Sequence, residues 1–198
     1  QTYSMGLRLV RLAHAAWRHS SLASVARPFI EALAEKIGES IHLAQIDNGH
    51  VLFVDKYRAT DKFDTLAQAG KIAPGYCTGV GKVILAFMPE RAQKRALDEQ
   101  SFVAYTSNTH RDRTTLATEL SIIRKARVAY DREEHELGII SIACPILMGQ
   151  EQVVGAVSIA TSTNRYCIDD LKKHWPDLCD TANSIGAQAE LWQVPTWG

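Results

Sequence analysis

The sequence reads IISIACPIL over residues 139–147, MGQE over 148–151 and QVVGAVSIA over 152–160, and this stretch decides the fold. The first and third runs are apolar and have the length of strands. The four residues between them include glycine and polar side chains, which are typical of a tight turn. We therefore expect two antiparallel strands joined as a hairpin.

Further strand patterns lie upstream of this hairpin. Ser40–Ile46 and Val51–Tyr57 flank Asp47-Asn-Gly-His50, and the Asn-Gly pair is a strong hairpin signal. Additional strands are predicted at Phe63–Ala69 and at Val128–Asp131, and a loop is predicted over Lys71–Cys77.

Apolar residues repeat at helical spacing between the strands. Helices are predicted over Leu22–Ile37, Val83–Met88, Pro89–Glu99, the region of Leu116–Ile123, and Ile168–Trp192. Pro28 predicts a kink or a late start in the first helix, and Pro176 predicts a bend in the last. Strands joined as hairpins, with helices between and after them, predict an α+β fold with a mostly antiparallel sheet.

Composition limits the classes of function. The 198 residues suit one domain, or one domain with a short appendage, and 46% of them are hydrophobic. The formal net charge is zero, whereas a chain that binds DNA through its phosphates normally carries an excess of positive charge. The four cysteines lack the C-x-x-C spacing of zinc or redox sites. No signal peptide and no membrane-spanning run is evident, so we expect a cytoplasmic protein without a membrane partner.

Glycine-containing motifs exclude one common nucleotide site. Gly79-Val-Gly-Lys82 lacks the upstream glycine of a P-loop, and Val83 stands where Ser or Thr would hold magnesium. No Rossmann unit is present either. The sequence thus predicts no nucleotide cofactor, and no cofactor of another kind.

Five segments, in this order and spacing, resemble one family of proteins. They are Gly38-Glu-Ser-Ile-His-Leu43, Thr78-Gly-Val-Gly-Lys-Val-Ile-Leu-Ala86, Asp131-Arg-Glu-Glu-His-Glu-Leu-Gly138, Ile142-Ala-Cys-Pro145 and Ala156-Val-Ser-Ile159. Each is weak alone, but together they resemble the isocitrate lyase regulator (IclR) type of bacterial transcription factor. The resemblance covers nearly the whole chain and implies a GAF-like or profilin-like fold, with helices on the faces of the sheet and a closed ligand pocket.

The same resemblance implies a division of the chain. Residues 1–20 would be a linker helix from a winged helix-turn-helix domain missing here, with Tyr3–Gly6 as the tail of the wing, and residues 21–198 the effector-binding domain. Operator DNA would be bound through the missing domain, and the protein would form a homodimer or a tetramer. The sequence departs from the family at Arg127, where glycine is frequent, and at Ser141 and Ala160, where several members have Cys and Ser. The family's keto-acid ligands therefore cannot be assumed.

Thr78, Gly79 and Val80 are the first candidate ligand contacts. They would lie at the N-terminus of a helix, where free N–H groups and the positive end of the dipole favour an anion. Glycine also allows a carboxylate to approach the backbone closely. The alternative is that the glycines only form a tight turn and that Lys82 is solvated.

Polar residues in the strands supply the remaining candidates. Asp131 is expected to turn inward toward ligand hydroxyl or acid groups, although a hydrated strand end is the alternative, and hydration is preferred for Glu133, Glu134 and Glu136. Strand alternation sends Ser141 and Ser158 to the face opposite their apolar neighbours. There they would contact a ligand, with Ile139 as an apolar wall, unless backbone carbonyls satisfy both hydroxyls.

Three functions are compatible with these residues. The preferred one is the effector-binding and oligomerisation domain of a transcriptional regulator, repressor or activator, whose ligand is a small organic acid. The second is a GAF-like thiol enzyme that uses Cys77, although no histidine lies near it in the sequence. The third is an interaction module whose pocket is only packed core. His42 and His135 lack metal-ligand spacing, so we expect surface or hydrogen-bonded histidines, no metal site and no catalytic residue.

Overall fold

A computed structural model describes residues 6–8, 11, 22–47, 49–58 and 67–191. Its centre is a six-stranded sheet of order β3-β2-β1-β6-β5-β4, in which every neighbouring pair is antiparallel. The strands are β1 (Ser40–Asp47), β2 (His50–Arg58), β3 (Ile72–Pro74), β4 (Ala129–Arg132), β5 (Ile139–Met148) and β6 (Gln152–Ser162). The predicted α+β class, antiparallel sheet and both hairpins are therefore confirmed.

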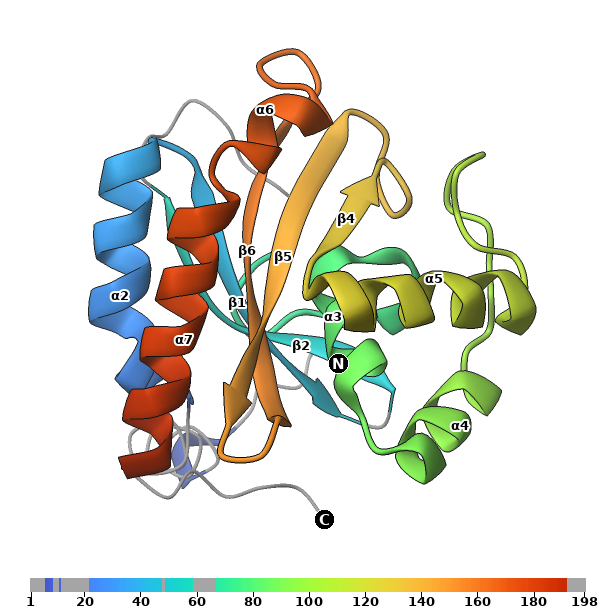
Figure 1. The fold of residues 1–198 in the computed structure, drawn as a ribbon, viewed down its shortest axis with the longest axis horizontal. Helices are drawn as coiled ribbons and strands as arrows, with labels where there is room; N and C mark the ends of the chain where they lie inside the picture. Colours follow the sequence, from blue (N-terminus) through green and yellow to red (C-terminus); the bar gives the residue numbers. More distant parts are fainter. Residues whose placement is uncertain (1–5, 9–10, 12–21, 48, 59–66, 192–198) are drawn as a thin grey trace.

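Helices cover both faces of the sheet (Figure 1). They are α2 (Leu22–Ile37), α3 (Gly79–Phe87), α4 (Glu90–Asp98), α5 (Arg113–Ala126), α6 (Ile168–Lys172) and α7 (Trp175–Leu191). Helices α2 and α7 lie side by side against one face, whereas α3 and α5 pack on the other. None of the helices in the described ranges is long and apolar enough to cross a membrane.

Strand alternation gives the two faces different side chains. In β5, Ile140, Ile142 and Cys144 are buried in the core beneath α2 and α7. Ser141 and Ala143, which alternate with them, face α3 instead. The α3 face thus carries small side chains, and this allows a helix to approach the sheet closely.

Two glycines place the start of α3. An added Cβ at Gly81 would lie 2.4 Å from the carbonyl oxygen of Gly75, and one at Gly79 would lie 2.7 Å from the hydroxyl oxygen of Ser141. Any larger side chain would push α3 away from the sheet or from the preceding turn. The motif therefore fixes the position of this helix.

Several predicted boundaries were wrong. The third strand is Ile72–Pro74, inside the predicted loop, while residues 63–66 of the predicted strand lie outside the described residues. Only three residues of this edge strand pair with β2, and so short a run contains no alternating pattern that would predict a strand. Helix α3 begins at Gly79 and not at Val83. Most of the predicted linker helix over residues 1–20 also lies outside the described residues.

Two prolines have different effects on their helices. Helix α2 runs through Pro28 from Leu22, so the late start that this proline suggested is wrong. The predicted last helix is two helices, α6 and α7, and the second begins just before Pro176. Proline fits the first turn of a helix, because the N–H that it lacks has no intrahelical acceptor there.

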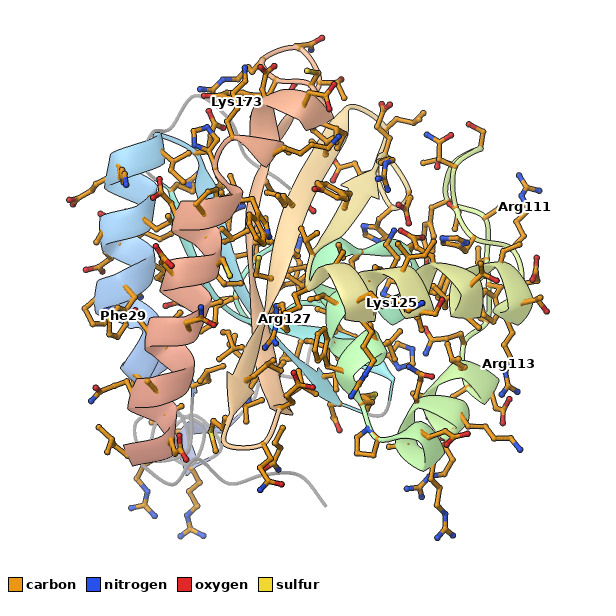
Figure 2. The ribbon with its side chains drawn as sticks, in the orientation of Figure 1. Phe29, Arg111, Arg113, Lys125, Arg127 and Lys173 are labelled. Atoms are coloured by element: carbon orange, nitrogen blue, oxygen red, sulfur yellow. The ribbon has the colours of Figure 1, made fainter. Side chains whose placement is uncertain are left out.

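Arg127 follows the last residue of α5, and its backbone is in the left-handed conformation. Glycine adopts this conformation readily, which fits its frequent occurrence at this position in the proteins that the sequence resembles. The φ of Arg127 is 57°. The guanidinium group donates to Glu151 at 3.0 Å and lies over the ring of Phe87. Figure 2 shows this exposed side chain in front of strands β5 and β6, whereas Arg111 and Arg113 lie at the right of the view, at and before the start of α5.

Candidate functional site

All seven predicted ligand contacts line one cavity between α3 and the sheet, with a volume of about 280 Å³. They come from the start of α3 (Thr78, Gly79, Val80), from β4 (Asp131), from β5 (Ile139, Ser141) and from β6 (Ser158). Ala160 also lies in the wall, as the family resemblance implied. The structure thus brings these residues together, and their contact with a ligand remains a prediction, as does the closed form of the pocket.

The start of α3 presents backbone donors to this cavity. The hydroxyl oxygen of Thr78 accepts a hydrogen bond from the amide of Gly81 at 3.2 Å and donates one to the carbonyl of Pro74 at 3.0 Å. The amides of Gly79 and Val80 precede the first intrahelical donor, which is the amide of Lys82, and so have no partner within the helix. This end of α3 is therefore suited to a negatively charged group.

Asp131 supplies a buried carboxyl group beside those amides. Its oxygen Oδ1 accepts a hydrogen bond from the backbone amide of Glu134 at 2.8 Å, and no described residue donates to Oδ2. Burial, together with the nearby Glu134 carboxylate, raises the pKa of Asp131 to about 7. The group can thus donate or accept a hydrogen bond near neutral pH.

Ser141 and Ser158 lie on neighbouring strands of the same sheet face. Both side chains are buried, and neither hydroxyl has a hydrogen-bond partner within the described part of the chain. The alternative that backbone carbonyls satisfy them is therefore not what the structure shows. Both hydroxyls line the cavity, so each can donate or accept a hydrogen bond with a ligand there.

Lys82 and Glu134 are both buried, against the alternative of a solvated Lys82 and the expectation of a hydrated Glu134. Lys82 is 0% exposed, and its ammonium group lies 2.5 Å from Glu134 and 2.9 Å from Glu119. Glu119 also contacts His110. Burial would raise the pKa of Glu119, but hydrogen bonds from His110 and Lys82 outweigh it and lower that pKa to about 2. Sequence reasoning missed this cluster because its members are 37 and 52 positions apart from Lys82.

The same cluster has donor groups of the kind that bind metals. Atoms of His110, Glu119 and Glu134 lie within 4.8 Å of one another. The ammonium group of Lys82 already lies against both carboxylates and offsets part of their negative charge. The structure therefore gives no reason to assign a metal to them.

Two histidines that were expected at the surface or in hydrogen bonds line the cavity. His42 is only 4% exposed, and its ring meets that of Phe53 edge-on at 5.5 Å. Burial lowers the pKa of His135, which favours its neutral form. The alternation rule that located Ser158 also identifies His42, because His42 lies between the buried Ile41 and Leu43. The other lining residues that sequence reasoning did not assign are Phe53, Ala67, Lys71, Ile72, Ala73 and Glu136.

Cys77 does not meet the requirements of a nucleophile. It is fully buried and is not part of the cavity wall. Burial, followed by the charges of Asp131 and Glu134, raises the pKa of its thiol. The thiolate that a thiol enzyme needs is therefore disfavoured, and the alternative based on Cys77 has no support.

Comparison with known proteins identifies one group of relatives. Residues 14–187 match the sequence profile of the family described as "Bacterial transcriptional regulator IclR C-terminal". The DNA-binding transcriptional repressor YiaJ of Escherichia coli is 30% identical over 93% of this chain and 66% of its own length. The probable transcriptional regulator SauR of Cupriavidus necator is 25% identical over 89% of this chain and 70% of its own length. The chain thus spans about two thirds of these relatives, which are transcriptional regulators and not enzymes.

Solved structures show the same fold. The IclR protein of Thermotoga maritima superimposes with a TM-score of 0.85 and 26% identity, covering 95% of this chain and 76% of that one. The inducer-binding domain of the PobR transcription factor from Acinetobacter, a double mutant in complex with 3-hydroxybenzoic acid, gives a TM-score of 0.76 and 26% identity over 84% of this chain and 98% of that one.

Proposed function

Since this chain belongs to the IclR family of bacterial transcriptional regulators, as its C-terminal effector-binding domain, we propose that it binds a small organic acid in the cavity beneath α3. The observation that carries the proposal is the set of unsatisfied polar groups at this cavity. Oδ2 of Asp131 and the hydroxyls of Ser141 and Ser158 all lack partners among the described residues. A ligand that supplies partners for these groups gains hydrogen bonds on binding.

An acid fits this arrangement better than a cation or an apolar molecule. The carboxylate would accept hydrogen bonds from the amides of Gly79 and Val80, where the dipole of α3 also favours a negative charge. Asp131, when protonated, donates to the same carboxylate and so avoids repulsion between two anions. Ile139 then packs against the apolar part of the ligand.

The relatives support the same class of ligand. The PobR inducer-binding domain, which shares this fold, has been seen in complex with 3-hydroxybenzoic acid. That finding belongs to PobR, and it shows only that a domain of this shape accommodates an acid. The polar groups that line the cavity are the reason for proposing an acid as the ligand of this chain.

The regulatory role is a proposal about a larger protein. Residues 1–20 would form a linker helix that joins residues 21–198 to a DNA-binding helix-turn-helix domain. Two or four chains would assemble in the cytoplasm and bind an operator of matching symmetry. The ligand would shift the equilibrium between two arrangements of the subunits by no more than its difference in affinity for them.

A thermal-shift screen tests the binding proposal. The chain is mixed with small carboxylic, sugar and aromatic acids and with their neutral amides, and each mixture is checked for turnover. An acid at one hundred times its dissociation constant should add about 2.7 kcal/mol, or roughly 5–10 °C. The neutral amide should give a smaller rise, and the acid should be recovered intact.

Substitutions at the cavity connect a positive result to this site. Asp131→Ala and Ser158→Ala should each weaken binding by about 1–3 kcal/mol, because each leaves a polar group of the ligand unpaired. Ser121→Ala, on the exposed side of α5, is the matched control and should bind as the unchanged protein does. Equal binding by all of these proteins would remove the assignment. A screen in which no acid raises the melting temperature would contradict the proposal itself.

A further inference from the structure

Two of the four cysteines meet in the core on the face of the sheet opposite the cavity. Cys144 lies in β5 and is 1% exposed, whereas Cys179 lies in α7, is partly exposed and packs against the same core. The two positions are 35 residues apart, so no spacing in the sequence indicates that they are neighbours. The acid site proposed above uses neither of them.

Helix α7 lies close to β5, and a glycine makes this approach possible. An added Cβ at Gly186 would overlap the carbonyl oxygen of Leu147. One helical turn further on, Glu190 reaches the turn that follows β5, where an added Cβ at Gly149 would lie 3.8 Å from its carboxylate. The helix and the strand therefore run in the same direction at this contact.

The spacing along both elements brings the two cysteines to the same level. Cys179 precedes Gly186 by seven residues, which is two turns and about 10 Å of helix, so both lie on the helix face toward β5. Cys144 precedes Leu147 by three residues, which is also about 10 Å of strand. The two side chains accordingly meet, and Cys179 is the hydrogen-bond partner of Cys144.

The two thiols differ in their access to solvent. Burial raises the pKa of Cys144, and the neighbouring Cys179 raises it further, so the Cys144 thiol stays protonated and shielded from reagents. Cys179 is partly exposed, and the side-chain amide of Asn183 donates to its sulfur at 3.8 Å. An oxidant from solution therefore reaches Cys179 first.

We propose that Cys144 and Cys179 form a reversible disulfide when a hydroperoxide oxidises this domain. The sulfur of Cys179 attacks the O–O bond of the hydroperoxide, which gives a sulfenic acid at Cys179 and releases water or an alcohol. The sulfur of Cys144 then attacks the sulfenic sulfur, and its proton leaves with the hydroxide as water while the S–S bond forms. The hydroperoxide accepts both electrons, and a dithiol reductant reverses the change.

The bond would tie one helical layer to the sheet. Helix α7 packs on α2 as well as on β5, and Lys36 of α2 pairs with Asp177, two positions before Cys179. A cross-link between α7 and β5 therefore restrains both helices on this face and involves no residue of the cavity wall. The inference is thus independent of acid binding.

Thiol mapping by mass spectrometry tests the inference. The reduced chain is treated with hydrogen peroxide, the remaining thiols are alkylated, and the peptides are mapped before and after addition of dithiothreitol. We expect Cys144 and Cys179 to be joined, whereas the buried Cys77 remains a thiol. The oxidised chain should melt about 5–10 °C higher, because the cross-link restricts the unfolded chain, and dithiothreitol should reverse this shift.

Single substitutions separate the roles of the two cysteines. Cys144→Ala should leave the sulfenic acid of Cys179 without a partner, so its dimedone adduct should increase about tenfold or more over the unchanged protein. Cys179→Ala should leave Cys144 reduced. Cys167→Ala, at an exposed position just before α6, is the matched control and should form the disulfide as the unchanged protein does.

Several results would overturn the inference, and the first two need no variant to fold. One is an unchanged protein in which Cys144 remains a thiol after peroxide treatment, whether or not Cys179 is oxidised. Another is a disulfide that joins two chains through Cys179 or that includes Cys167. A bond between Cys144 and Cys179 without a rise in melting temperature would show that α7 must leave the sheet before the sulfurs meet, against the geometry on which the inference rests.

Discussion

Asp131 shows how one buried side chain links the stability of the domain to its chemistry. Its carboxyl group accepts a hydrogen bond from the amide of Glu134 and lines the cavity. Burial raises its pKa from 3.8 to about 7, so the folded protein binds a proton at pH values where the unfolded chain has released it. This carboxyl group therefore favours folding below its unfolded pKa, and that contribution is lost as the pH rises toward 7.

Asp131→Asn is expected to change the pH dependence of stability. The unchanged protein should lose about 2–3 kcal/mol relative to the variant between pH 5 and pH 8, or roughly 5–10 °C in melting temperature. Thermal unfolding of both proteins across this range measures the difference. Asp180→Asn, at an exposed position of α7, is the control and should follow the unchanged protein. If the melting temperatures of Asp131→Asn and of the unchanged protein varied with pH in parallel, the raised pKa of Asp131 would be contradicted.

Two glycines, which carry no side chain, allow the start of α3 to lie close to the sheet and to the preceding turn. Gly81 contacts the backbone of Gly75, whereas Gly79 contacts the side chain of Ser141. A backbone group cannot rotate away, but a serine hydroxyl can. The two glycines should therefore respond differently to the same substitution.

Gly81→Ala should destabilise the protein by about 3 kcal/mol or more, because its methyl group would overlap the backbone of Gly75. Gly79→Ala should cost about 1 kcal/mol, since Ser141 can turn aside, but its methyl group enters the cavity and should weaken acid binding. Chemical denaturation and ligand titration measure the two effects. Gly6→Ala, which meets no atom within 4 Å, is the control. Equal stability of the Gly81→Ala and Gly79→Ala proteins would show that the close approach of α3 is unimportant.

The ion-pair cluster joins α3 to α5 and to the β4–β5 connection. Lys82→Met removes the only positive charge placed against Glu134 in the described ranges and should cost about 3–5 kcal/mol. Adding Glu134→Gln should restore about half of that loss, because one uncompensated charge is removed. Urea denaturation measures both variants against Lys94→Met, at an exposed position of α4. If adding Glu134→Gln to Lys82→Met lowered the stability further, charge pairing would not be the cause of the first loss.

Elements whose signals are local were predictable from the sequence. The alternation around Ser141 and Ser158 located both residues on the α3 face, and Gly79-Val-Gly81 marked the start of a helix. The burial of Lys82 was not predicted, since nothing near it in the sequence indicates that Glu119 and Glu134 fold against it. Long-range pairing of charges depends on the packing of three elements, and no local pattern encodes it.

The whole molecule is a sheet with helices on both faces and no excess of positive charge. Lys and Arg number 22, as do Asp and Glu. Many of the positive side chains form ion pairs, for example Arg127 with Glu151 and Lys36 with Asp177. The sequence as a whole therefore carries no excess of positive charge to attract a phosphate backbone.

The chain by itself should not bind DNA measurably. In about 100 mM salt we expect no retardation of a duplex fragment at protein concentrations up to about 10 µM, since non-specific binding depends on an excess of Lys and Arg over acidic groups. A gel-shift titration measures this, with a basic helix-turn-helix protein as the positive control. Retardation that weakens steeply with salt would show that residues 1–198 themselves contact phosphates, against the division of roles proposed here.

The two-sided sheet also has a consequence for how this domain can change over evolutionary time. In β5 and β6 the side chains that face the cavity alternate strictly with those that form the core beneath α2 and α7. A mutational library restricted to Ile139, Ser141, Ser158 and Ala160 would therefore vary the ligand while leaving the opposite core untouched. New specificities can arise on such a scaffold by single steps, as long as the new side chain leaves room for α3, which packs closely on the same face.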